Sequence, residues 1–128
     1  MSSSPPDLDV LVRRFADGAV ALRRAWDAVP VAAREWRPGA ARWSAHEVAF
    51  HCADAAAVGY ARLRYLLAED DPLIVGWDQD AWARVLEYHA LPIDLAFATI
   101  EWAIAGTVPL VGRLTPRALA RAGRHTES

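Results

Sequence analysis

Three long segments of this 128-residue chain, 5–29, 44–69 and 93–114, carry apolar residues at alternating steps of three and four. That spacing places the apolar side chains on one face of a helix. The positions are Leu8, Leu11, Phe15, Ala19, Leu22, Trp26 and Val29 in the first segment, Val48, Cys52, Ala55, Gly59, Leu63 and Leu66 in the second, and Ile93, Phe97, Ile100, Ile104, Val108, Val111 and Leu114 in the third. The sequence therefore predicts three amphipathic helices of roughly 22 to 25 residues that share one core.

Local signals mark the ends and weak points of these helices. Ser4 is a suitable cap for the first helix. Ser44, with Glu47 three residues later, has the pattern of a capping box and begins the second. In the third helix, Gly106 and Pro109 weaken the backbone hydrogen bonding, so a kink is expected there.

The connection between the second and third long helices, about 71–91, is too long for a tight turn. Asp78 can cap a short helix within it. A connection of this length suits a crossover between two helices that run in the same direction. Thr115 then begins another short helix, which Gly123 ends. The sequence therefore predicts an all-α bundle with three long helices, a crossover helix and a short C-terminal helix.

Composition narrows the class of protein. The length predicts a single domain over residues 1–128. A net charge of −2 argues against a nucleic-acid partner, because such binding needs clustered positive charge. Cys52 is the one cysteine, so no disulfide can form within the chain, and no signal peptide is visible. Charged residues interrupt the apolar runs, so no membrane span is expected. We therefore expect a cytoplasmic protein.

The short C-terminal helix cannot cover the length of the three long ones. A four-helix bundle built in this way keeps one long apolar groove open, and apolar surface of that extent usually marks an interface. We therefore expect either a homodimer, in which a partner subunit fills the groove, or a chain that lacks the C-terminal part of a complete bundle.

One face of the second helix carries the residues best suited to chemistry. Glu47, His51 and Asp54 lie at positions i, i+4 and i+7 on that face, beside the apolar stripe. A histidine between two carboxylates can act as a metal ligand or a general base. A histidine at the edge of a core can also be a structural, hydrogen-bonded residue, and the spacing does not separate these interpretations.

The other reactive side chains give weaker signals. His89 and His125 are interpreted as structural or solvated residues, and Cys52 as a small buried one. Glu101 flanks the apolar stripe of the third long helix, but the chain lacks the paired Glu-x-x-His segments of a di-iron bundle. Most of the six tryptophans are assigned to the core and to helix contacts.

The order of residues also carries a resemblance. The segments that carry it are Val29-Pro30, Trp36-Arg37-Pro38-Gly39, Arg42-Trp43-Ser44-Ala45-His46-Glu47-Val48-Ala49-Phe50-His51-Cys52-Ala53-Asp54, Asp78 with Trp82, and Arg121-Ala122-Gly123-Arg124-His125. This pattern resembles the DinB/YfiT-like superfamily over nearly the whole chain, and its Trp-Ser-x-x-Glu…His…Asp part is the most specific.

The resemblance implies a bundle in up-down-down-up order and a divalent metal, zinc or nickel. In the family one histidine of the second helix and a His-x-x-x-His pair of the fourth bind the metal. The first ligand falls on His51, and the other two have no counterpart, so the domain is C-terminally incomplete relative to the family. If the site is rebuilt from other residues, the candidates are Glu47, Asp54, Glu101 and His125.

Two hypotheses about function follow. The first is a DinB-like metal-dependent enzyme, a hydrolase or an S-transferase that uses a low-molecular-weight thiol. The second is a non-catalytic dimeric helical module that binds a small apolar ligand or a protein partner in the open groove. The sequence alone does not choose between them.

Overall fold

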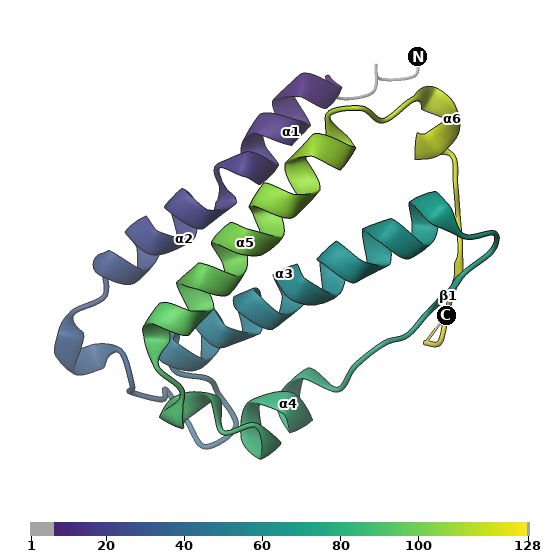
Figure 1. The fold of residues 1–128 in the computed structure, drawn as a ribbon. Coiled ribbons are helices and arrows are strands. Elements are labelled where there is room, and N and C mark those ends of the chain that lie inside the picture. Colours follow the sequence, from purple (N-terminus) through teal and green to yellow (C-terminus); the bar gives the residue numbers. More distant parts are fainter. Residues whose placement is uncertain (1–6, 128) are drawn as a thin grey trace, which may run out of the picture.

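The structure is a computed structural model that describes residues 7–127. Its two longest helices, α3 (Ala45–Ala68) and α5 (Ile93–Val111), pack against each other and run in the same direction (Figure 1). The helices α1 (Leu8–Ala16) and α2 (Gly18–Asp27) lie along α5 and run in the opposite direction. The all-α fold is confirmed, and the parallel arrangement of α3 and α5 confirms the crossover.

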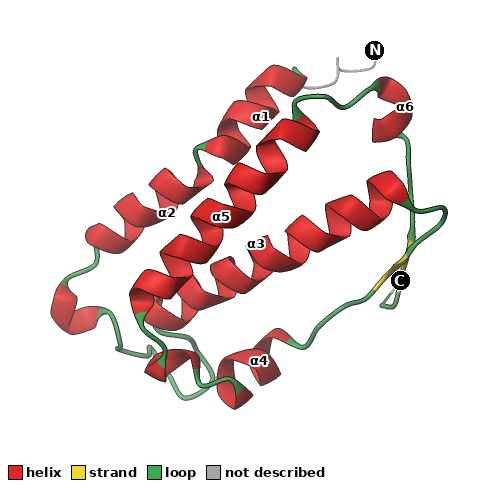
Figure 2. Cartoon of the chain, viewed as in Figure 1, coloured by secondary structure: helices red, strands yellow, loops and turns green. Residues whose placement is uncertain are grey.

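The shorter elements lie around this framework, as Figure 2 shows. The crossover contains β1 (Leu73–Ile74), α4 (Gln79–Val85) and the 3-10 turn η2 (Tyr88–Ala90), while η1 (Val31–Ala33) follows α2. After α5 come α6 (Pro116–Leu119) and β2 (Arg124–His125). Among the described residues, no fourth long helix is present, and the last segment instead extends beside the crossover.

The first helix differs from its prediction, because it is broken into α1 and α2. The break falls at Asp17, which caps both helices, and Gly18 follows it. Aspartate and glycine are both poor formers of helix interiors, and this local weakness breaks the helix despite the continuous apolar stripe. Asp7 caps α1 by accepting a hydrogen bond from the backbone of Asp9. The predicted cap, Ser4, lies outside the described residues.

The start of α3 agrees with its prediction. The Ser44 hydroxyl accepts a hydrogen bond from the Glu47 backbone, and the Glu47 carboxylate accepts one from the Ser44 backbone, each at 3.1 Å. The other predicted caps, Asp78 and Thr115, are confirmed in the same way, because each side chain accepts a hydrogen bond from the backbone three residues on.

The predicted apolar stripe of α3 is wrong in orientation. Its buried residues are His46, Glu47, Ala49, Phe50 and Ala53, whereas Val48 is 41% exposed. This helix has small residues on several faces, and it is covered by α5 on one side and by the crossover on another. Both contacts determine which faces of α3 are buried, whereas a single apolar stripe in the sequence indicates only one buried face.

The core lies between α3 and α5 and extends to α2. The residues that form it are Trp26, Ala49, Phe50, Ala53, Ala83, Tyr88, Ala96, Phe97 and Ile100. The ring of Trp26 meets that of Phe97 edge-on, with 6.0 Å between centroids. By length and composition alone α5 could cross a membrane, which the sequence analysis did not expect. In this fold it is the central helix of the bundle.

Two long-range contacts hold the crossover and the C-terminal segment in place. The buried Tyr88 hydroxyl donates a hydrogen bond to Asp54 on α3. The strands β1 and β2 pair in parallel, and this pairing was not predicted. A Cβ on Gly123 would lie 2.6 Å from the carbonyl oxygen of Pro72, so glycine permits the C-terminal segment to approach this closely.

Gly106 gives a test of the α3–α5 contact. Alanine in a helix interior is ordinarily about 1 kcal/mol more favourable than glycine. Here a Cβ would lie 2.6 Å from the Tyr60 ring, which is stacked on Trp102 and covered by Arg64. We expect Gly106→Ala to lower the free energy of unfolding in urea by about 1–2 kcal/mol. The control is Gly59→Ala, where a Cβ meets nothing within 4 Å, and which should be neutral or stabilising.

Candidate functional site

His51 is the centre of the candidate site. Its ring lies 4.9 Å from that of Trp43, in the loop before α3, and 6.4 Å from that of Trp77, in the crossover. The side chain is half-buried, and its Nδ1 atom is buried without a hydrogen-bond partner among residues 7–127. The interpretation of His51 as a hydrogen-bonded structural residue is therefore not supported.

His46 shows what a structural histidine looks like in this fold. It is 8% exposed, and its Nε2 lies 2.8 Å from the carbonyl oxygen of Leu91. Its ring also packs on Phe50 and Trp26. His46 thus joins α3 to the end of the crossover, while His51 projects from another side of the same helix.

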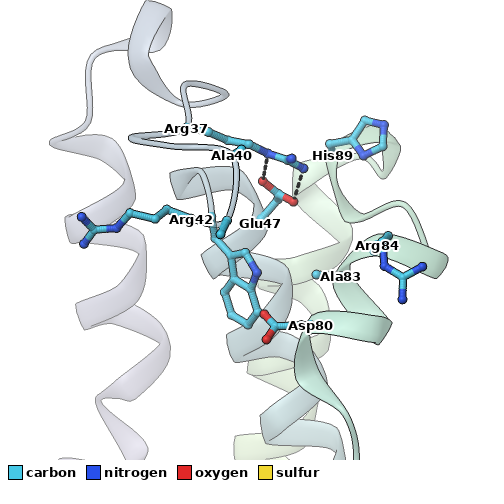
Figure 3. A pocket seen from close by; sticks show the side chains of 10 residues that line it. Arg37, Ala40, Arg42, Glu47, Asp80, Ala83, Arg84 and His89 are labelled. Atoms are coloured by element: carbon cyan, nitrogen blue, oxygen red, sulfur yellow. Dashed lines mark hydrogen bonds and ion pairs between the residues drawn. The ribbon is translucent and has the colours of Figure 1, made fainter.

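Glu47, predicted to act beside His51, has a structural role here. Its side chain is 2% exposed, and its two oxygens accept hydrogen bonds from Nε and Nη2 of Arg37, both at 2.7 Å (Figure 3). Burial alone raises the pKa of this carboxyl group. The hydrogen bonds from Arg37 and Ser44 and the charge of Arg37 outweigh that effect, so the pKa of Glu47 is lowered.

Asp54 is also engaged elsewhere, since it accepts the hydrogen bond from Tyr88. Burial and the neighbouring Asp54 carboxylate raise the pKa of the Tyr88 hydroxyl, which therefore remains a donor at ordinary pH. Cys52 is half-buried, and burial raises the pKa of its thiol. This agrees with its interpretation as a packing residue rather than a nucleophile.

The two remaining candidates lie in other parts of the fold. Glu101 is exposed on α5. His125 lies in β2, where its Nδ1 accepts a hydrogen bond from the backbone of Glu127 and its Nε2 lies 3.4 Å from Arg62. Within residues 7–127, no three or more His, Cys, Asp or Glu side chains are grouped so that they could hold a metal. These residues do not form a metal centre on their own.

The aromatic side chains around His51 were not predicted from the sequence. Trp43 lies 8 residues before His51 in the sequence, and Trp77 lies 26 residues after it. Most tryptophans were assigned to the core and to helix contacts, so the contact of Trp43 and Trp77 with the imidazole was not predicted. The one available signal was position, because Trp43 directly precedes the cap of α3 and Trp77 directly precedes the cap of α4.

A cavity of about 340 Å³, lined in part by Trp43, lies at the end of the bundle where α3 begins. Figure 3 shows the side chains that line it, which come from the loop before α3, from the first turn of α3 and from the crossover. Arg42, Asp80, Arg84 and His89 are its charged or titratable residues besides the Arg37–Glu47 pair. No sequence motif predicted this cavity, because two segments far apart in the chain form its walls.

Known proteins resemble this chain in sequence. No protein-family model matches it. A protein of Oceanobacillus iheyensis, named "Putative metal-dependent hydrolase", is 31% identical over 86 residues, which are 67% of this chain and 49% of that protein. A Bacillus licheniformis protein of the same name is 34% identical over 59 residues, which are 46% of this chain and 34% of that protein. The matches thus span half or less of the length of these relatives.

The resemblance in structure is more extensive. YfiT from Bacillus subtilis, described as a probable metal-dependent hydrolase with an unusual four-helix bundle topology, matches with a TM-score of 0.87 and 20% sequence identity. The match covers 98% of this chain and 72% of YfiT. The chain therefore has the DinB/YfiT-like fold, and the resemblance found in its sequence is confirmed at the level of the fold.

Proposed function

We propose that this chain is the His51-bearing part of a metal-dependent hydrolase and that His51 supplies one metal ligand. The observation that carries the proposal is the buried, unpartnered Nδ1 of a half-buried histidine between two indole rings. Buried polar atoms are ordinarily hydrogen-bonded, so an orphaned imidazole nitrogen points to a ligand. The names of the relatives support the same class of enzyme.

The number of available metal ligands limits the metal binding that residues 7–127 can achieve alone. Catalytic zinc sites use three protein ligands and keep a fourth position for water or substrate. The described residues offer one such ligand at this place. In this proposal the other ligands come from polypeptide outside residues 7–127, and the role of this chain is to hold the first imidazole between Trp43 and Trp77.

A hydrolase is favoured over the thiol-dependent transferase because the relatives carry the name hydrolase. The non-catalytic module remains the second candidate, and the isolated position of His51 is the observation that favours it. The two candidates differ in one measurable property, which is a preference of His51 for a metal ion.

Paramagnetic Ni²⁺ tests that preference in the purified chain. We expect increasing Ni²⁺ to broaden the imidazole NMR signals of His51 at lower concentration than those of His89, which is exposed. A partly desolvated imidazole with a free nitrogen needs no hydrogen bond broken to bind metal, whereas His46 would have to release Leu91. His51→Ala should abolish this first phase, and His89→Ala should leave it intact.

Broadening of His89 before His51, or an unchanged titration in His51→Ala, would contradict the proposal and favour the module. Chemical shifts elsewhere in each variant serve as the check that the bundle is intact.

A further inference from the structure

A second cavity, of about 490 Å³, lies between α3 and the first part of the crossover. Its wall is mainly apolar, with Val58 and Tyr65 from α3 and Leu73 and Val75 from the crossover. Tyr65, Leu73 and Val75 are 49%, 52% and 64% exposed, so the apolar wall is open to solvent. The volume is in the range of small-molecule sites, which combine apolar walls with a few placed polar groups.

Among the described residues, the wall of this cavity holds one cation, Arg62, and one acid, the exposed Glu69, and the two form no ion pair. Nη2 of Arg62 donates a hydrogen bond of 2.7 Å to the carbonyl oxygen of Val75, and its guanidinium lies 5.1 Å from the Trp77 ring. Its Nε is buried and has no partner, and no ion pair within residues 7–127 involves it. A partly buried guanidinium without a carboxylate is unfavourable, and an anion would relieve that cost.

Three buried side-chain nitrogens lack partners in the described part of the chain, namely Nδ1 of His51, Nε1 of Trp77 and Nε of Arg62. These residues are neighbours, since Trp77 lies against His51 on one side and under Arg62 on the other. The indole and guanidinium nitrogens can only donate hydrogen bonds, so what satisfies them must be an acceptor.

We infer that this cavity binds a small carboxylate with an apolar body, whose oxygens accept hydrogen bonds from the Arg62 guanidinium while the body lies against Tyr65, Leu73 and Val75. Hydrogen bonds from a guanidinium to a carboxylate are charge-assisted and are among the strongest that proteins form. The site lies one indole ring away from His51, but binding requires no metal. The inference therefore goes beyond the proposed hydrolase and can fail or hold separately from it.

Octanoate and 1-octanol are the probes, because they share an apolar chain and differ in the carboxylate. Each is titrated into the purified protein by calorimetry at neutral pH with EDTA present, so the result does not depend on metal at His51. We expect octanoate to bind at least tenfold more tightly than octanol, since a hydrogen bond to a charged group contributes roughly 1.5–3 kcal/mol. Added salt should weaken octanoate binding but not octanol binding.

Substitutions then test whether Arg62 binds the carboxylate of octanoate. Arg62→Gln removes the charge and should remove the discrimination between the probes. The matched control is Arg84→Gln, which removes an exposed arginine from the other cavity and should leave both affinities unchanged.

Equal affinities of the unaltered protein for octanoate and octanol, or no binding of either, would overturn the inference without any variant. Unchanged discrimination in Arg62→Gln would also overturn it.

Discussion

Replacing Arg37 with glutamine is expected to lower the free energy of unfolding at pH 7 by about 3 kcal/mol, because a buried carboxylate then loses its charged partner. Glu47 is 2% exposed, whereas Arg37 is 46% exposed. The reverse substitution, Glu47→Gln, should therefore cost less, about 2 kcal/mol, since the freed guanidinium is already half in water. Urea unfolding of the two variants measures this asymmetry. Arg42→Gln in the same loop is the control and should change stability by less than about 0.5 kcal/mol.

The pH dependence of the same variants provides an independent check. The pKa of Glu47 is lowered in the folded state from its ordinary value of 4.5. Its contribution to stability is therefore complete above that value and is lost as the pH falls through the folded-state pKa. In Arg37→Gln the hydrogen bonds and the charge of Arg37 no longer lower the pKa of Glu47, so this part of the acid destabilisation should become smaller. A loss of stability between pH 5 and pH 3 as steep in Arg37→Gln as in the unaltered protein would contradict the assigned role of the pair.

The largest effect is expected for Phe97→Ala, at about 4 kcal/mol of unfolding free energy. Phe97 is 3% exposed, packs edge-on against Trp26 and lies under the guanidinium of Arg23, with 4.1 Å from Cζ to the ring centroid. Its removal opens a cavity where α2, α3 and α5 meet. Phe15→Ala is the matched control, because Phe15 is 42% exposed and should cost less than about 1.5 kcal/mol. Similar losses for the two variants would mean that the core is not centred on α5.

The parts of the fold that the sequence predicted correctly depend on local chemistry. The caps at Ser44, Asp78 and Thr115 each need only a side chain and a backbone amide three residues later. The crossover followed from the length of one connection. Pairing of β1 with β2 could not be predicted, because it joins segments 51 residues apart and only two residues in each strand take part.

The sequence predicted where the site lies on α3, but it did not predict the side chains that surround His51. His51 was identified from its face of the helix, and its relation to Trp77 depends on the path of the crossover. Glu47 and Asp54 share that face, but Arg37 and Tyr88 engage their carboxylates. Helical spacing shows which side chains are neighbours on one element. It does not show which of them a distant segment has already paired.

The parallel course of α3 and α5 also has an electrical consequence. In an antiparallel pair the peptide dipoles cancel, whereas here they add, and both positive ends lie at the same end of the molecule. Each of the two helices has an acid in its first turn, Glu47 in α3 and Asp94 in α5, where a negative charge is favourable. These two acids, together with the opposed dipoles of α1 and α2, offset part of the positive charge at that end of the bundle.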